Sequence, residues 1–175
     1  MRNAWHSQPR PRRSAQTSEV FSRIVKHFRI PLIAVVGGAD CSPQEAAWAE
    51  EVGRLLARHG YGVVCGGRGG VMAAVCKGAN QMGGVTVGLL PGEDASEANP
   101  WVQIVIPTGI GEARNALVAR AGEGVIAIGG GYGTLSEIAL ALKWGKRVAG
   151  LGTWEIEGAY RAASPEDAVE YILER

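Results

Sequence analysis

Short apolar stretches alternate with helical patterns from about residue 31 to the end of the chain. Each stretch is continuously apolar, without a period of two, which predicts strands buried on both faces. The expected strands are 32–36, 61–65, 85–90, 101–106, 125–128 and 147–151. Helices are expected at 43–59, through 72–79, around 114–120, at 138–144 and at 165–174. This alternation predicts an α/β fold, a Rossmann-like doubly wound parallel sheet with helices on both faces.

Two helix starts carry cap signals. Ser42 followed by Pro43 fits an N-cap and a first-turn proline, and Ser164 fits the N-cap of the closing helix. Before the first strand, apolar residues at helical spacing predict a short amphipathic helix over 18–28 that packs on the domain.

One folded domain is expected over 19–175, because 175 residues suit a single core. Residues 1–18 are rich in proline, arginine and serine, and we expect a disordered basic tail. This composition fits an organelle transit peptide, a nucleic-acid-binding arm or a solvated tail, and we favour the solvated tail.

The composition argues against several classes of protein. The net charge of +1 gives no overall attraction to nucleic acid or membrane, and no apolar run approaches the ~20 residues of a membrane span. Three cysteines without CxxC spacing and three histidines outside the glycine motifs suggest no metal site. No nicotinamide or Walker A fingerprint is present. We therefore expect a cytoplasmic protein with no metal, cofactor, nucleic-acid partner or membrane contact.

Residues 129–137, Gly-Gly-Gly-Tyr-Gly-Thr-Leu-Ser-Glu, join an expected strand to an expected helix. Glycines allow close approach to the main chain, and a helix N-terminus directs N–H groups and a positive dipole end at one point. The stretch predicts a bound anion, with tight strand–helix packing as the alternative. Glycine turns at 37–38 and 66–70 also follow strands, so the three turns are expected to converge at one edge of the sheet.

These motifs resemble those of the Lonely Guy (LOG) family, often mislabelled lysine decarboxylases. Residues 129–137 resemble its Pro-Gly-Gly-x-Gly-Thr-x-x-Glu signature, 65–72 its Gly-Gly-x-Gly-Leu-Met turn and 112–115 its Arg-Lys segment. Gly129 stands where the family has proline, and Asn115 where it has lysine. Both differences resemble a shorter branch of the superfamily, which includes the molybdenum cofactor carrier proteins.

The resemblance implies roles for individual residues. Glu137 would act on a ribose, where a carboxylate stabilises an oxocarbenium-like transition state or activates water. Arg114 would be the catalytic or phosphate-facing arginine. Alternatives remain: a capping box of Thr134 with Glu137, and surface charges at Arg114 (paired with Glu112) and Arg68. The residues expected to bind the ligand phosphate are Gly66, Gly67, Arg68, Asn115, Gly130, Gly131, Tyr132, Gly133 and Thr134.

Two functions are compatible with the resemblance. One is a nucleoside 5′-monophosphate phosphoribohydrolase, which cleaves the N-glycosidic bond to release base and ribose 5-phosphate. The other is a non-catalytic carrier of a phosphate-bearing cofactor such as molybdenum cofactor, from which sequence does not separate a nucleotide sensor. Retained Arg114 and Glu137 give the enzyme a narrow preference. The partner is in each case a small-molecule nucleotide or phosphate-bearing cofactor, and the resemblance implies a homodimer or higher homo-oligomer.

Overall fold

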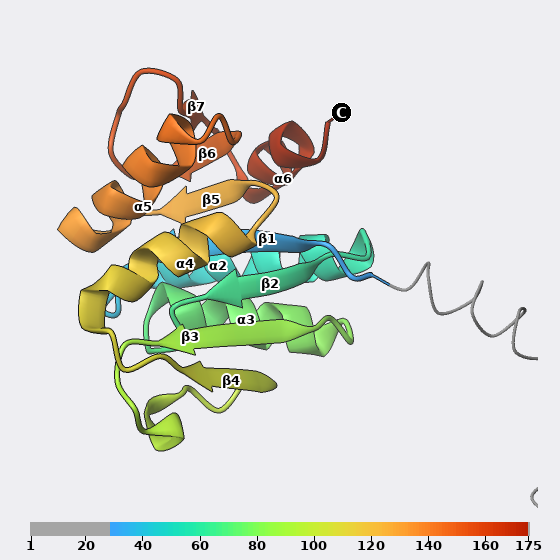
Figure 1. Ribbon diagram of the computed structural model, residues 1–175. Helices are drawn as coiled ribbons and strands as arrows, with labels where there is room; N and C mark the ends of the chain where they lie inside the picture. The colour runs from blue at the N-terminus through green and yellow to red at the C-terminus, as the bar shows by residue number, and fades with distance from the viewer. Residues whose placement is uncertain (1–28, 175) are drawn as a thin grey trace, which may run out of the picture.

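The computed structural model describes residues 29–174, in which seven parallel strands form one sheet (Figure 1). The sheet order is β4-β3-β2-β1-β5-β6-β7, and every neighbouring pair is parallel. The strands are β1 (Leu32–Gly37), β2 (Gly62–Cys65), β3 (Thr86–Leu90), β4 (Ile104–Pro107), β5 (Val125–Ile128), β6 (Val148–Leu151) and β7 (Tyr160–Arg161). The predicted Rossmann-like parallel sheet is confirmed.

Helices cover both faces of this sheet (Figure 1). One face carries α2 (Pro43–Arg58), α3 (Val71–Gln81) and α6 (Pro165–Leu173), and the other carries α4 (Arg114–Ala121) and α5 (Tyr132–Lys143). Ile33 and Val35 of β1 belong to the first core, whereas Ala34 and Val36 belong to the second. The alternation follows from strand geometry, and it explains why the buried strands are apolar at every position.

The central strand β1 is the point at which the order of the sheet reverses. Its neighbours are β2 on one side and β5 on the other. The chain leaves β1 toward α2 on one face and leaves β5 toward α5 on the opposite face. Two connections that diverge in this way open a crevice beyond the carboxyl ends of the two strands, where doubly wound proteins bind ligands.

Two elements differ from their predicted bounds by more than two residues, and three short elements were not predicted. The strand expected at 101–106 is found at 104–107, because Asn99 Oδ1 accepts a hydrogen bond from the Trp101 N–H and holds a turn there (3.0 Å). The helix expected at 138–144 begins at Tyr132 and ends at Lys143. A short 3-10 turn, η2 (Gly111–Ala113), precedes α4, another (η1, Ala95–Glu97) lies in the loop before β4, and β7 is an additional strand of two residues.

Both predicted serine caps are confirmed. Ser42 Oγ accepts a hydrogen bond from the Glu45 N–H (3.2 Å), and the Glu45 carboxylate accepts one from the Ser42 N–H (2.7 Å). Ser164 Oγ accepts from the Asp167 N–H (3.2 Å). The helix expected at 18–28 and the tail at 1–18 lie outside the described residues, so the domain boundary stays a prediction. Within residues 29–174, no helix is long and apolar enough to cross a membrane.

Candidate functional site

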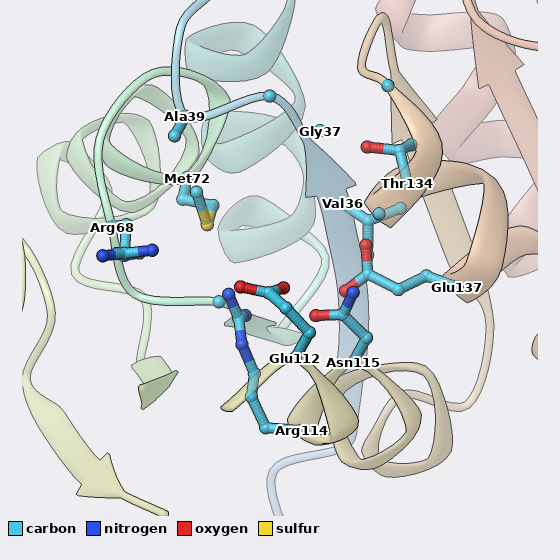
Figure 2. A pocket seen from close by; sticks show the side chains of 14 residues that line it. Val36, Gly37, Ala39, Arg68, Met72, Glu112, Arg114, Asn115, Thr134 and Glu137 are labelled. Atoms are coloured by element: carbon cyan, nitrogen blue, oxygen red, sulfur yellow. The ribbon is translucent and has the colours of Figure 1, made fainter. Parts of the chain in front are cut away.

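A cavity of about 220 Å³ lies at the carboxyl end of β1. The glycine turns after β1 and β2, the start of α4 and the first turns of α5 all reach it, as the three-turn convergence predicts. Figure 2 shows Glu112, Arg114, Asn115 and Glu137 directed into the same space. Its lining residues are Val36, Gly37, Gly38, Ala39, Gly66, Arg68, Met72, Glu112, Arg114, Asn115, Gly131, Gly133, Thr134 and Glu137.

The N-terminus of α5 opens into this cavity. Gly131 is the N-cap, and the first backbone bond of the helix runs from the Leu135 N–H to the Gly131 carbonyl (3.0 Å). The N–H groups of residues 132–134 therefore have no partner within the helix. Gly131 has φ −104° and ψ −149°, outside the left-handed region, and among the described residues no atom lies within 4 Å of the place where its side chain would stand. No packing contact requires glycine there, and the missing side chain leaves the main chain open to the close approach of a ligand.

Gly129 and Gly130, which precede Gly131, are glycine for a different reason. Gly129 and Gly130 have φ values of +51° and +86°, which favour glycine. A side chain at position 130 would collide with Thr134, and one at position 129 would collide with the Glu45 carboxylate. Proline, with φ fixed near −65°, does not fit the backbone at Gly129, which accounts for the departure from the LOG signature.

Arg114 is buried at the start of α4, with 6% of its surface exposed. Its guanidinium lies against Gly66, where any side chain would collide with it. Its Nε has no hydrogen-bond partner among the described residues, and no ion pair within 4.0 Å neutralises it there. The alternative of a surface charge paired with Glu112 is wrong. A buried, unpaired guanidinium is costly without an anion beside it.

Glu137 is equally buried, with 6% of its surface exposed, and lies in the second turn of α5. Burial raises the pKa of its carboxyl to about 8, against the opposing influence of Arg114 and with smaller contributions from Cys65 and Glu112. The carboxyl is therefore mostly protonated at neutral pH. The capping-box alternative is wrong, because Gly131 is the N-cap and Thr134 lies inside the helix.

Two further buried polar residues complete the floor of the cavity. Thr134 is 3% exposed and Asn115 is 7% exposed. Asn115 Nδ2 donates a hydrogen bond to Ser136 Oγ (3.4 Å), whose hydroxyl donates to the Gly133 carbonyl (2.6 Å). This chain fixes the Asn115 amide against the first turn of α5.

Arg68 lies at the mouth of the cavity. Its side chain is 46% exposed, and its guanidinium is 3.9 Å from the Glu97 carboxylate. An ion pair of this length and exposure contributes little to stability, so Arg68 can turn to another anion at low cost.

Three residues predicted from the sequence do not line the cavity. Gly67 is buried against Leu90 and Gly88, Gly130 borders a neighbouring cavity with Trp154, and Tyr132 is 82% exposed beside the Trp154 ring. The other eight do line it: Gly66, Arg68, Arg114, Asn115, Gly131, Gly133, Thr134 and Glu137.

The sequence prediction missed four lining side chains, Val36, Ala39, Met72 and Glu112. Val36, Ala39 and Met72 belong to strand ends and turns already expected at the site, so their position next to the glycine turns in the sequence could have identified them. Glu112 stood in the sequence only as a partner for Arg114. Among residues 29–174, no group of histidine, cysteine and acidic side chains is arranged to hold a metal ion.

The fold and cavity together define a LOG-like protein of the Rossmann type. More narrowly, the chain belongs to the SLOG cluster4 family, whose model matches residues 30–173. The resemblance inferred from the glycine motifs is thereby confirmed. An uncharacterized protein of Archaeoglobus fulgidus is 43% identical over 147 residues, which is 83% of this chain and 97% of that protein.

Solved structures of molybdenum cofactor proteins are also similar to this chain, and two of them illustrate the likeness. The molybdenum cofactor binding protein of the phototrophic bacterium Rippkaea orientalis is 36% identical, with a TM-score of 0.78 over 83% of this chain and 96% of that chain. The molybdenum cofactor carrier protein of Chlamydomonas reinhardtii is 38% identical, with a TM-score of 0.74 over 81% of this chain and 94% of that chain.

Proposed function

We propose that this protein binds a small molecule through a phosphate group at the N-terminus of α5 and holds it without turnover. The observation that carries the proposal is Gly131, an open glycine that no packing contact requires, next to N–H groups without a partner in the helix. Arg114 supplies a buried cation in the same cavity. Dipole, N–H donors and guanidinium together stabilise a phosphate.

The cavity is small compared with the ligand. Sites for drug-sized molecules enclose about 300–1,000 Å³, whereas this one encloses about 220 Å³. It has room for a phosphate and the atoms next to it, and the remainder of the ligand would extend toward the mouth, where the exposed residues Glu112 and Arg68 lie. Molybdenum cofactor, a pterin that carries a phosphate, is a ligand of this class, and similarity to the binding and carrier proteins supports it.

Two features favour a carrier over an enzyme. A protonated Glu137 donates a hydrogen bond to an anionic oxygen, but it does not supply the negative charge that an oxocarbenium-like transition state needs. Asn115 stands where the LOG signature has a lysine; its amide donates hydrogen bonds but does not replace the positive charge that the enzymes of the family have there.

The second candidate is the phosphoribohydrolase. Arg114 and Glu137 line one cavity, as a ribose-directed pair requires, and this favours the enzyme.

Calorimetry with ribose 5-phosphate tests the binding. We expect Arg114→Met to weaken binding about 100-fold, because it removes the buried cation and keeps most of the volume. Arg58→Met, at an exposed position of α2, is the matched control and should leave affinity unchanged. Equal binding by wild type and Arg114→Met would contradict the proposed site.

Chromatography separates the two candidates. The protein is incubated with AMP and GMP, and free base is measured for wild type and Glu137→Gln. A carrier returns the nucleotide intact. Base released by wild type and not by the variant would instead establish the hydrolase.

The remaining partner prediction is a homodimer or higher homo-oligomer, which in the family forms through alanine-rich helices; here these are α2 and α5. Ala49 and Val52 on the buried side of α2 are already covered within the chain, where this helix packs against α3 and α6. The second helix, α5, keeps more of its surface exposed. Self-association stays a proposal, and light scattering tests it directly.

A further inference from the structure

Glu112 has no use in holding a phosphate. Its side chain lines the cavity, and Figure 2 shows its carboxylate directed into the space that Arg114 also faces. Among residues 29–174, no ion pair within 4.0 Å engages it. Glu112 is exposed, so its carboxylate lies on the open side of the cavity. Because a carboxylate repels a phosphate, it is suited to a different part of the ligand.

The backbone that carries Glu112 is held firmly. The Thr108 N–H donates to the Leu90 carbonyl (3.1 Å), the Gly109 N–H to Gly92 (3.0 Å) and the Gly111 N–H to Pro91 (2.9 Å). These bonds tie the segment before η2 to the end of β3. Glu112 is also close enough to Glu137 to contribute to its raised pKa. The position of the Glu112 backbone at the edge of the cavity is therefore fixed.

We propose that Glu112 reads the ring of the ligand and selects an amino-oxo heterocycle of the guanine or pterin class. In such rings a ring N–H lies beside an exocyclic amino group, and the two parallel donors match the two acceptor oxygens of one carboxylate. Adenine has an unprotonated ring nitrogen beside its amino group, and that lone pair would face a carboxylate oxygen. The inference rests on the proposed function, because the bound phosphate brings the ring to Glu112.

Calorimetry with GMP, IMP, AMP and ribose 5-phosphate tests this. GMP should bind at least about tenfold more tightly than AMP, with IMP between them because it lacks only the amino group. In Glu112→Gln the preference for GMP should disappear, since an amide offers one donor and one acceptor and matches adenine instead. Affinity for ribose 5-phosphate, which has no ring, should stay within about threefold of wild type.

Glu123→Gln is the matched control, because Glu123 precedes β5 at the opposite end of the sheet and outside this cavity. It should keep the GMP preference. The phosphate ester of 6-hydroxymethylpterin is titrated alongside GMP, and the ligand that binds more tightly shows whether the site prefers a pterin or a guanine ring. Affinity for that ligand should fall in Glu112→Gln.

The possible results distinguish failure of ring selection by Glu112 from failure of phosphate binding at α5. Failure of wild type to bind ribose 5-phosphate overturns the proposed function and the inference together. Binding of ribose 5-phosphate with equal affinities for GMP and AMP overturns the inference alone. So does a GMP preference that survives in Glu112→Gln.

Discussion

The chain contains two strand–glycine–helix units that look alike in sequence and differ in structure. In the first, β2 leads through residues 66–70 into α3, and in the second, β5 leads through residues 129–131 into α5. The N-terminus of α3 is closed by the protein itself, because the Val71 N–H donates to the Gly38 carbonyl (3.0 Å). The N-terminus of α5 faces a cavity.

The N-cap glycines of α3 and α5, Gly70 and Gly131, also differ in conformation and in the space around them. Gly70 has φ +59° and ψ −129°, and a side chain there would collide with the carbonyl oxygens of Gly38 and Ala39. Gly131 has φ −104° and open space around it. A glycine run after a strand therefore serves two purposes, close packing of backbone in one case and room for a ligand in the other. Conformation and surrounding space distinguish them, and composition does not.

The largest effect should follow from a side chain at the closed helix start. Gly70→Ala places Cβ in a conformation nearly restricted to glycine and against two carbonyls, so we expect about 3 kcal/mol or more of lost stability. Urea unfolding followed by circular dichroism measures it. Gly131→Ala is the matched change at the open start and should cost less than about 1 kcal/mol. Similar losses in both variants would remove the distinction between the units.

Restoring the proline of the LOG signature should also destabilise the protein. Gly129→Pro cannot adopt φ +51° and would displace the Glu45 side chain that caps α2. We expect a loss of about 3 kcal/mol in the free energy of unfolding. Gly130→Ala tests the neighbouring positive-φ glycine and should be destabilising for the same backbone reason. A Gly129→Pro protein as stable as wild type would show that this turn accepts the family conformation.

At the open helix start, stability and binding should move in opposite directions. Gly131→Asp introduces a preferred N-cap residue and a negative charge at the positive helix end, which should stabilise the fold by about 0.5–1 kcal/mol. The same charge occupies the anion position, so affinity for ribose 5-phosphate should fall about 100-fold. Thermal unfolding and calorimetry on one preparation measure both. Gly131→Asn, which caps without charge, is the control, and unchanged phosphate affinity in Gly131→Asp would contradict the site.

Much of the fold could be predicted because the parallel sheet leaves a strong signal. Strands buried on both faces are continuously apolar, so β1 and β5 were located almost to the residue, and Ser42 and Ser164 mark their helices through local hydrogen bonds. Strand β4 begins later than predicted because Asn99 holds a turn at Trp101, and Asn99 is itself fixed by tertiary hydrogen bonds from its Nδ2 to the Gly67 and Arg68 carbonyls.

The site was predictable only in part, for a related reason. Residues in the glycine motifs are located by local geometry, so Gly131, Gly133 and Thr134 were found. Whether a glycine such as Gly67 faces the cavity or the core depends on Leu90, which is distant in sequence. The burial that raises the Glu137 pKa likewise comes from several elements at once and leaves no mark in a single segment.

The smallest predicted effect is the dependence of binding on pH. The pKa of Glu137 is raised from 4.5 to about 8, so the carboxyl is neutral below that pH and charged above it. Ribose 5-phosphate keeps the same charge above about pH 7, since phosphate monoesters lose their second proton near pH 6. Affinity should therefore fall about tenfold between pH 7 and 9.5 in wild type, through repulsion by the Glu137 carboxylate, and stay constant in Glu137→Gln. The raised pKa of Glu137 contributes stability that is complete below about pH 4.5 and is lost as the pH rises to about 8. The unfolding free energy of wild type should therefore fall relative to that of Glu137→Gln between these two pH values. A wild-type affinity that is flat to pH 9.5 would mean that Glu137 stays away from the phosphate, and would move the ligand toward Arg68 and the mouth of the cavity.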